Sequence, residues 1–451
     1  MIDLNDLRTR PDAYKKAAKD KNIRLDVDAF LKLDEQRRAL LPGIEELRKM
    51  QNDASKKIPG LKGKEKEELL KKMKTVSDSL KESEAELKGI EEQWKQMQYV
   101  FPSIPLSTVP VGKDDSENVE VRKWAPHQSS AAADSGAGQG DAIVLLGENP
   151  PKTPKSHVEL GEALDIIDLS RGANVSGARS YFLKGEGARL QQAVMRYTMD
   201  HLYAKGWTLF TPPLMATYDC FMGTGFFPGA DENQIYVVGG KEDGAFVSDN
   251  LHLIGTSEVT VCSYHKDEIL KESDLPKRYA GYSACFRREA GTYGKDTKGL
   301  YRVHQFEKVE QVVLCRADQE EALALFEEIR NNAEEVLQAL KLPYRVIDVC
   351  TGDMGKGKVF MQDIETWMPS RNGYGETHSC SYLGDFQARR LNIKYTAEDG
   401  EKKFVHTLNN TCVASPRILI PILEMYQNED GSVTVPEVLR QYMGGLKKIG
   451  A

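Results

Sequence analysis

Polar and aromatic residues alternate along one otherwise apolar segment, RVHQFEKVEQVVLC. Every second residue from position 302 to 310 carries a group that could bind a ligand: Arg302, His304, Phe306, Lys308 and Glu310. Successive side chains of a strand point to opposite faces, so these residues share one face. Burying such a face is costly unless a polar ligand satisfies it. Arginine can clamp a phosphate or carboxylate, and phenylalanine can stack on adenine. The pattern favours a nucleotide site; the alternative is a structural ion-pair network.

Two later segments carry groups suited to phosphate. Glu376 and Ser379 follow a second polar strand predicted at 359–368 and could share a divalent metal with triphosphate oxygens, because Mg²⁺ is usually held by one or two carboxylates plus phosphate. Taken alone, Glu376 is better explained as a surface acid. Pro416 suits the first turn of a helix. Arg417 would then sit in the N-terminal part of that helix, whose dipole also attracts phosphate.

Other motifs for nucleotide binding, nucleophilic catalysis and metal binding are missing from the sequence. It contains no G-x-x-x-x-G-K-[ST] phosphate loop, no G-x-G-x-x-G and no nucleophile elbow. The seven cysteines are odd in number, lie 23 to 42 residues apart and form no C-x-x-C. We therefore expect neither a disulfide framework nor a zinc site.

Local periodicity predicts the elements that must hold these groups. A helix is predicted over 187–205, ended by Gly206 and followed by the strand WTLF and by Thr211-Pro212-Pro213. Strands are predicted over 279–286 and 302–315, joined by the Gly- and Lys-rich loop AGTYGKDTKGLY. Helical and strand patterns continue to the end of the chain. Residues 156–451 are therefore expected to form a globular body of the α+β class.

The first 101 residues have a different pattern. Apolar residues keep a strict 4-3-4-3 spacing from Leu33 to Ile58 and again from Leu69 to Phe101, with the short segment PGLKG between the two series. A sustained 3.5-residue repeat indicates a coiled coil, and the Pro/Gly break turns the chain back. We therefore predict an antiparallel helical hairpin over about 30–101 within an N-terminal domain of residues 1–101, which projects as an arm because its first helix is about 40 Å long.

The expected tip of this hairpin is basic in an acidic protein. The chain has 61 Lys and Arg against 68 Asp and Glu, a net charge of −7, yet residues 48–74 hold ten basic and four acidic residues. Clustered lysine and arginine gain affinity for nucleic acid by displacing counterions. A solvated coiled-coil surface or a dimerisation arm explains the charge equally well. The candidate phosphate-binding residues are Arg48, Lys49, Lys56, Lys57, Lys62 and Lys64.

The segment between arm and body is rich in proline and small residues. Residues 102–155 contain seven prolines and the stretch QSSAAADSGAGQG at 128–140, a composition typical of a linker with a disordered insert. No uncharged apolar run approaches the roughly 18 residues needed to span a bilayer. The N-terminus has no basic segment followed by an apolar stretch. We therefore expect a cytoplasmic protein without a membrane partner.

Taken together, these segments resemble the seryl-tRNA synthetases of class II. Pro212-Pro213 is similar to the first class II motif, FRREAGTYGKDTKGLYRVHQFEKVE to the second motif in its seryl form, and LNNTCVASPRILIPILE to the third. TSE at 256–258, ETHS at 376–379 and FQARR at 386–390 fall in the family's order, as do the opening MIDLNDLRTRPDAYK and the ending VPEVLRQYMGG. The resemblance implies an antiparallel sheet flanked by helices, a homodimer joined through the first motif, and an arm that reads serine tRNA.

The resemblance also implies roles for individual residues. Arg287 would hold the serine carboxylate and the ATP α-phosphate together, Glu289 and Phe306 would hold adenine, and Arg417 the γ-phosphate. The implied catalytic residues are Arg287 and Arg417. The implied serine pocket is Thr256, Glu258, Arg287, Glu310, Asn409 and Thr411. The implied ATP-binding residues are Arg287, Arg288, Glu289, Arg302, Val303, Phe306, Glu376, Thr377, His378, Ser379 and Arg417. Glu376 and Ser379 would bind Mg²⁺. The implied partners are L-serine, ATP, tRNA(Ser) and tRNA(Sec).

Three features depart from the family pattern. Residues 127–153 form an insertion, His378 stands where a small or aliphatic residue is usual, and Pro421 falls inside the predicted third-motif helix, where it should bend the helix or remove a backbone bond. The rival interpretations are a synthetase for threonine, which would need a zinc site and leave the arm unexplained, and a non-catalytic relative. The retained Arg287, Glu310 and Arg417 disfavour the second rival.

Overall fold

The computed structural model describes residues 1–126, 143–290 and 299–450. The Ser/Ala/Gly-rich stretch 128–140, predicted to be disordered, lies outside the described residues, as does most of the loop between the two second-motif strands. Two compact units make up the chain, Met1–Ile104 and Pro105–Ala451. Within the described parts, no helix is both long and apolar enough to cross a bilayer.

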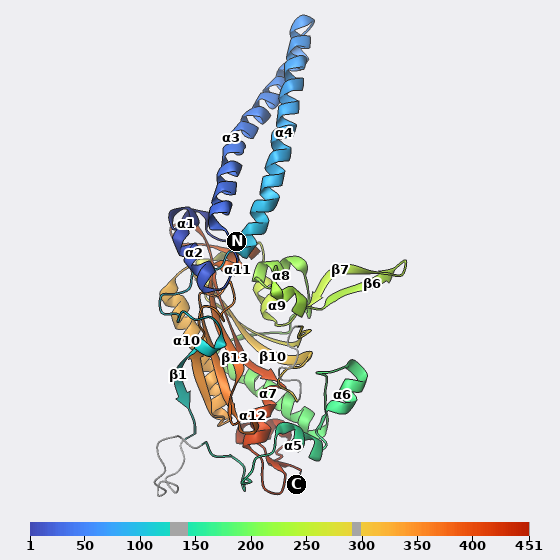
Figure 1. Ribbon diagram of the computed structural model, residues 1–451, viewed down its shortest axis with the longest axis vertical. Coiled ribbons are helices and arrows are strands. Elements are labelled where there is room, and N and C mark those ends of the chain that lie inside the picture. The colour runs from blue at the N-terminus through green and yellow to red at the C-terminus, as the bar shows by residue number, and fades with distance from the viewer. Residues whose placement is uncertain (127–142, 291–298, 451) are drawn as a thin grey trace. The chain divides into compact units, whose positions relative to one another are not determined.

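The first unit contains the two long helices that the heptad pattern predicts (Figure 1). They pack against each other along their length. The unit consists of α1 Leu4–Thr9, α2 Pro11–Asp20, α3 Val27–Lys57, the short 3-10 helix η1 Ile58–Gly60 and α4 Lys64–Val100. The predicted N-terminal helical arm is therefore confirmed, with η1 and Gly63 forming the turn.

The predicted heptad positions form the seam between α3 and α4. Ile44 and Ala54 of α3 and Val76 and Leu80 of α4 are buried there. Arg37 is a polar heptad position, and its side chain donates to Glu91 at 3.0 Å while its guanidinium lies 4.6 Å from the centre of the Trp94 ring. The polar heptad residue Arg37 therefore contacts residues of α4 across the seam.

Near the base of the hairpin, Asp34 is a buried charge, 1% exposed. Its carboxylate accepts from Arg8 at 2.8 and 3.1 Å, from Arg38 at 3.1 Å and from the Trp94 indole at 3.3 Å. Burial by itself would raise the pKa of this carboxyl, but the hydrogen bonds from Arg8 and Trp94 and the charges of Arg8 and Arg38 together lower it below its usual range. Asp34 therefore ties α1 and α4 to α3 in its ionised form.

Replacing Asp34 by asparagine should destabilise the first unit by about 2 kcal/mol, because Arg8 and Arg38 lose their charged acceptor. A group with a lowered folded-state pKa stabilises the fold above its unfolded pKa, about 4, and that stabilisation is lost as the pH falls. The difference between variant and parent should therefore shrink in acid. Urea unfolding followed by far-ultraviolet circular dichroism measures it.

Asp28 provides the control for this prediction, because its ion pair with Lys15 at 2.8 Å is exposed. Asp28→Asn should change the unfolding free energy by no more than about 0.5 kcal/mol. Equal effects of the two substitutions would contradict the role given to Asp34.

The second unit is built on one large sheet. Its strands are β1 Val119–Trp124, β4 Thr208–Phe210, β9 Lys277–Phe286, β10 Gln305–Cys315, β11 Tyr344–Asp348, β12 Phe360–Met368, β13 Gly373–Gly384 and β16 His406–Ser415. They run in the order β1-β11-β12-β13-β16-β10-β9-β4. Every neighbouring pair is antiparallel except β4 and β9, which are parallel. The predicted antiparallel sheet is confirmed.

Helices and smaller sheets surround this sheet. The helices are α5 His157–Ala163, α6 Leu169–Ser176, α7 Gly185–Ala204, α8 Tyr218–Thr224, α9 Glu258–Ser263, α10 Gln319–Ala339, α11 Phe386–Leu391 and α12 Leu419–Met425, with 3-10 turns η2 Asp115–Glu117, η3 Ala230–Gln234, η4 Glu272–Asp274, η5 Pro369–Arg371 and η6 Glu437–Met443. The remaining strands are β2 Ile167–Asp168, β3 Phe182–Leu183, β5 Met215–Thr217, β6 Val237–Glu242, β7 Ala245–Leu253, β8 Ile269–Lys271, β14 Lys394–Thr396, β15 Lys402–Phe404, β17 Val433–Thr434 and β18 Lys448–Ile449. Together they give the α+β class that the sequence predicts.

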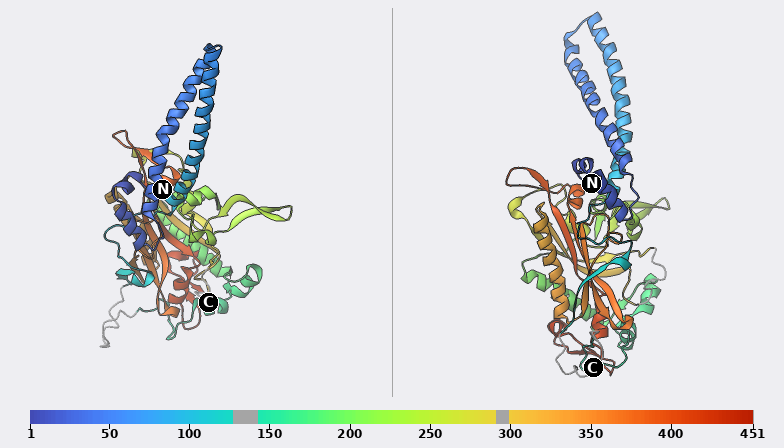
Figure 2. Two further views of the ribbon diagram at one scale, coloured as in Figure 1. Left: turned by 45° about the horizontal axis from the view of Figure 1, so that its top comes forward. Right: turned by 60° about the vertical axis from the view of Figure 1, so that its left-hand side comes forward.

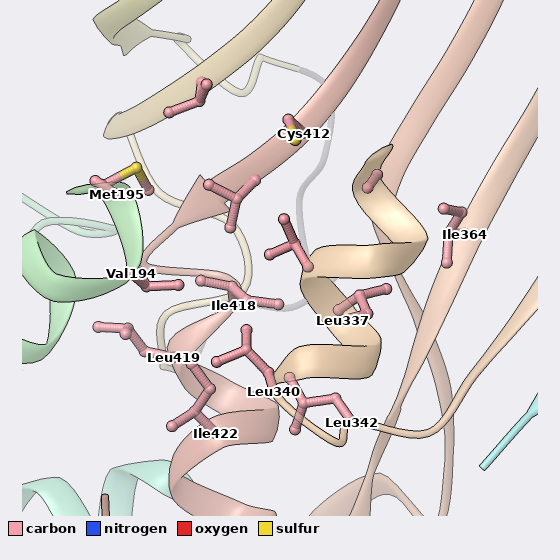
Figure 3. Packing of buried hydrophobic residues seen from close by; sticks show 14 of the residues in the cluster. Val194, Met195, Leu337, Leu340, Leu342, Ile364, Cys412, Ile418, Leu419 and Ile422 are labelled. Carbon is pink, nitrogen blue, oxygen red and sulfur yellow. The ribbon is translucent and has the colours of Figure 1, made fainter. Parts of the chain in front are cut away.

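The main core lies where α7, α10 and α12 pack on the sheet. α10 contacts β16 and β13, and the turned views show it lying along the sheet (Figure 2). In the close view, side chains of α7, of the end of α10 and of α12 converge beside the strand that carries Cys412 (Figure 3). Burial of these apolar surfaces is the main stabilising term. The core covers one face of β10, β13 and β16, and the opposite face of these strands carries polar side chains.

Four local predictions need correction. Part of the predicted linker, Val119–Trp124, is strand β1 at the edge of the main sheet, and Leu106 donates its backbone N–H to Val359. β10 begins at Gln305, so Arg302 and His304 lie before the strand. α12 begins at Leu419, so Arg417 precedes the helix. Pro421 is the third residue of α12, where backbone N–H groups have no partner within the helix, and so it removes no helical bond.

Candidate functional site

A cavity of about 570 Å³ opens on the polar face of the sheet in the second unit. Its walls come from β10, β13 and β16, from the segment after β9, from the end of α8 and from the loop before β12. The volume is that of a typical small-ligand site. It is lined by most of the site residues that the sequence singles out: Thr256, Glu258, Arg287, Glu289, Arg302, Val303, Phe306, Glu310, Glu376, Thr377, Ser379, Asn409, Thr411 and Arg417.

Arg287 is held where β9 ends. Its backbone N–H donates to His304 at 2.9 Å, its Nε donates to the Gly255 carbonyl at 3.3 Å, and its guanidinium carbon lies 5.1 Å from the centre of the Phe306 ring. A stacked guanidinium keeps its planar edge available for bidentate bonds. Arg287 is thus placed beside the aromatic ring expected to stack on a base.

Glu289 forms a second charged group near Phe306. Its carboxylate accepts from Arg302 at 2.8 Å, with Arg179 at 3.9 Å. Its backbone has φ of 50°, which is uncommon for a residue with a side chain. Such a conformation persists only where the surroundings require it, and such positions cluster at functional sites.

Two carboxylates lie deeper in the cavity. Glu310 of β10 is 2% exposed and forms an ion pair with Lys308, and it accepts from the Thr411 hydroxyl at 3.4 Å. Glu258 opens α9 and accepts from Gln387 at 2.7 Å. Shielding from water and the charge of Glu310 raise the pKa of Glu258 to about 7. Paired acids beside hydroxyl and amide groups can bind a small ligand that carries an ammonium and a hydroxyl.

A register shift between β10 and β16 assembles this part of the site. Val309 pairs with Val413, but Glu310 pairs with Thr411, so Cys412 is bypassed. The shift turns Thr411 and Asn409 to the face that carries Glu310. Cys412 instead enters the core.

Arg417 lies on the part of the cavity wall that Tyr301 and Glu376 also line. Its Nε donates to the Tyr301 carbonyl at 3.1 Å, one terminal nitrogen donates to the Glu376 carbonyl at 3.0 Å, and its guanidinium stacks 4.4 Å from the centre of the Tyr301 ring. The Glu376 carboxylate is 3.6 Å away. The tight turn before α12 therefore presents a restrained cation.

A second bulge places Glu376 and Ser379 on one wall. Ile364 pairs with His378 but Glu365 with Glu376, so Thr377 is the extra residue of β13. Without the shift, residues three apart on a strand would face opposite sides. Asp363 pairs with Ser379, and burial together with the charge of Glu376 raises the pKa of the Asp363 carboxyl. Among the described residues, no three His, Cys, Asp or Glu side chains are grouped to hold a metal.

Two residues of the predicted ATP set do not line the cavity. Arg288 donates its backbone N–H to Gln234 at 2.8 Å, and His378 is buried on the other side of β13, where its Nδ1 lies 2.8 Å from the Thr377 hydroxyl. Burial lowers the pKa of His378 to about 3, so the ring is neutral. His304 also lies outside the cavity, with its Nδ1 3.0 Å from the Arg287 carbonyl.

Sequence reasoning missed several lining residues. Lys356 and Lys358 lie on the loop GKGK before β12, and Tyr301, Gln234 and Phe386 complete the walls. Alternating glycine and lysine in a loop was the available signal for the first two. The others carry no local signal, because their positions depend on packing.

The candidate RNA-binding residues of the first unit are all exposed. Arg48 also forms an ion pair with Glu84 of α4 at 2.7 Å. Lys49 lies more than two helical turns before the end of α3, whereas the others lie close to η1: Lys56, Lys57, Lys62 and Lys64. The fold thus brings together at one turn the basic residues of two helices.

Comparisons with known families match both units. The seryl-tRNA synthetase N-terminal domain matches residues 1–105, and the tRNA synthetase class II core domain (G, H, P, S and T) matches residues 243–426. The serine–tRNA ligase of Deinococcus radiodurans is 45% identical over 100% of this chain and 99% of its own length. That of Carboxydothermus hydrogenoformans is 43% identical over 98% of each chain.

Solved structures show the same likeness. The seryl-tRNA synthetase from Pyrococcus horikoshii, in complex with ATP, superposes with a TM-score of 0.84 at 36% identity, covering 100% of this chain and 99% of that one. The cytoplasmic serine–tRNA ligase from Naegleria fowleri, in complex with AMP, has a TM-score of 0.79 at 30% identity over 97% and 95% of the two chains. Both likenesses extend over almost the whole chain.

Proposed function

Because the chain belongs to the seryl-tRNA synthetase family of class II ligases, we propose that it activates L-serine with ATP and transfers the seryl group to the 3′ end of tRNA(Ser), and also of tRNA(Sec). The observation that carries the proposal is the position of Arg287. It lies in one cavity with the acids Glu258 and Glu310 and with the aromatic ring of Phe306. One guanidinium can thus reach both an amino acid and a nucleotide.

The activation step needs alignment more than acid–base chemistry. A carboxylate oxygen of serine attacks the α-phosphorus of ATP, the bond from that phosphorus to the bridging oxygen breaks, and pyrophosphate leaves. The serine carboxylate is already ionised at neutral pH, so no general base is required. Arg287 holds both reactants and offsets charge on the α-phosphate, while Arg417 offsets charge on the leaving phosphates. A tRNA 3′-terminal hydroxyl then displaces AMP from the adenylate.

Serine recognition follows from the deep end of the cavity. The carboxylates of Glu258 and Glu310 can accept from the ammonium and hydroxyl groups, and Thr256, Asn409 and Thr411 add further polar contacts. A site built to hydrogen-bond a hydroxyl can reject the analogue without it by about 10⁴-fold, since buried polar groups would be left unpaired. Alanine should therefore be a very poor substrate.

The wall formed by Glu376 and Ser379 fits a Mg²⁺ ion that enters with ATP. Both side chains offer the oxygen ligands that Mg²⁺ prefers, and two protein ligands suffice when phosphates supply others. When bound, the ion would neutralise negative charge on the phosphates. Asp363 of β12 lies directly beside Ser379 in the β12–β13 ladder.

We also propose a homodimer joined through the Pro212-Pro213 region. Large exposed apolar side chains gather on the elements around this motif: Leu209, Leu214, Met215, Tyr218, Tyr264 and Ile269. Phe210 packs against Tyr264, 5.2 Å between ring centres, which links two of these segments. Exposed apolar patches of this kind mark interaction sites, and a second copy is the partner that the family favours.

Replacing Leu209 and Met215 together by glutamate should convert the dimer to a monomer, because two charges would be buried at the interface. Light scattering after size-exclusion chromatography should show the mass halved. Val119→Glu is the matched control, since Val119 is equally exposed but lies on β1 at the opposite edge of the sheet. A parent protein that is monomeric at micromolar concentration would refute the proposal.

Amino-acid-dependent exchange of pyrophosphate into ATP, measured with each of the twenty amino acids, tests the activity directly. Serine alone should support rapid exchange. Charging of transcribed tRNA(Ser) and tRNA(Sec) tests the acceptor. Exchange with threonine equal to that with serine, or none with serine, would overturn the proposal.

A further inference from the structure

Gln387 of α11 is a fully buried side chain next to the cavity but not part of its lining. Its amide nitrogen donates to Glu258 Oε1 at 2.7 Å and to the Thr224 carbonyl at 3.1 Å. Its amide oxygen accepts from the Thr407 hydroxyl at 2.7 Å and from the Cys262 thiol at 3.4 Å. Two donors and two acceptors exhaust what the amide group can bond.

These bonds determine which way the amide points. The Thr224 carbonyl can only accept, so the amide nitrogen must face it and the neighbouring Glu258. The four partners come from three elements: Thr224 ends α8, Glu258 and Cys262 belong to α9, and Thr407 belongs to β16. Gln387 therefore joins two segments that line the cavity, through Thr224 and Glu258, to the central strand of the sheet.

The two acids of the cavity have different partners. Glu310 is paired with the cation Lys308, whereas the Glu258 side chain accepts a hydrogen bond from the neutral Gln387 amide. The charged and titratable groups that face Glu258 are Glu310 and Lys308 of β10, Lys358 of the GKGK loop, and the Cys262 thiol on its own helix. The donated bond favours the ionised form of Glu258 against the adjacent Glu310 charge.

We propose that Gln387 is the positioning residue of the serine pocket: it fixes the Glu258 carboxylate at the cavity wall and so sets the affinity for serine. The inference deepens the proposed function and rests on it. Gln387 acts through Glu258 and touches no substrate. It should therefore affect serine binding and leave ATP binding unchanged.

The test replaces Gln387 by methionine, which has a similar shape but cannot hold the carboxylate. In the full chain, the KM for serine in pyrophosphate exchange should rise about 10- to 100-fold, as for loss of a hydrogen bond to a charged group. The KM for ATP should stay within about two-fold. The acid limb of the kcat/KM profile for serine should move to higher pH, because Glu258 loses a bond that favours its ionised form.

Gln427→Met is the matched control for general destabilisation. Gln427 is 1% exposed, and its amide makes three backbone hydrogen bonds, to Lys155 N–H and to the Lys155 and Glu424 carbonyls, far from Glu258 in the sequence. It should lower thermal stability about as much as Gln387→Met does. The KM for serine and the acid limb should not move in this variant.

A double-mutant cycle tests direct coupling. If Gln387 acts through Glu258, then Gln387→Met should change the affinity for serine by less than about two-fold in a Glu258→Gln background, because a contact that is already lost cannot be lost again.

The outcomes separate the inference from the proposed function. If the parent protein shows no serine-dependent exchange, the function itself fails. If the parent is active and folded Gln387→Met keeps its serine KM within about two-fold, Gln387 has no positioning role. Equal rises in the KM for serine and for ATP, or an undiminished effect of Gln387→Met in the Glu258→Gln background, would also overturn the inference.

Discussion

Arg287→Lys should reduce the kcat/KM of serine-dependent pyrophosphate exchange by about 10³-fold. Lysine keeps the positive charge but loses the planar fork that can bond a carboxylate and a phosphate at once. The Gly255 carbonyl and the Phe306 ring restrain the native guanidinium, and an ammonium group cannot make the same stack. Most of the loss should appear in kcat, because alignment matters most in the transition state. Steady-state exchange over a range of serine and ATP concentrations measures both constants.

Arg278→Lys serves as the control for this substitution. Arg278 lies on the same strand, β9, and makes a bidentate pair with Glu328 at 2.8 and 2.9 Å, away from the cavity. This variant should cost a little stability and keep exchange near the parent value. Arg287→Lys with more than a tenth of the parent kcat/KM would mean that one guanidinium does not join the two reactants.

Reversing four lysines at the turn of the arm, Lys56, Lys57, Lys62 and Lys64, to glutamate should lower kcat/KM for tRNA(Ser) charging by about 10²-fold or more at low salt. Each lysine–phosphate contact releases a condensed counterion, so its loss weakens RNA binding. All four side chains are exposed around η1, so the fold should tolerate the change. Serine-dependent pyrophosphate exchange, which needs no tRNA, should stay near normal.

The matched control reverses four exposed lysines of the second unit, Lys152, Lys341, Lys402 and Lys447. This control changes the net charge of the protein by the same amount. If only the arm variant loses tRNA aminoacylation, the loss comes from contacts between the arm and the tRNA and not from general repulsion between protein and RNA. The difference between arm variant and parent should also shrink as salt is raised. If charging and exchange fall together in the arm variant, the arm has a structural role instead.

The features that sequence alone predicted are those encoded by neighbouring residues. The 4-3-4-3 repeat from Leu33 to Ile58 and from Leu69 to Phe101 became α3 and α4, since a helical seam depends only on spacing along one chain. The strands at 279–286 and 359–368 likewise follow from alternation. β1 was missed because a short, exposed edge strand between prolines has no buried face to mark it.

The details of the site were decided by pairing between distant strands. Two bulges, at Cys412 and at Thr377, turn Thr411 and Glu376 toward the cavity. The local alternation of the sequence does not predict either bulge. His378, by contrast, follows simple alternation: it points away from the cavity because its neighbours Thr377 and Ser379 face it.

Gln387 shows most clearly what could not be predicted from the sequence. Its identity is visible in FQARR, but its role depends on Thr224, Glu258 and Thr407, which lie 163, 129 and 20 residues away. The sequence by itself thus determined the arm and the main strands, because these follow from local periodicity, and its resemblance to the synthetases indicated most of the residues that line the cavity. Only tertiary structure decided which groups share a face and which buried amide holds them, because register and burial are set by partners far apart in the chain.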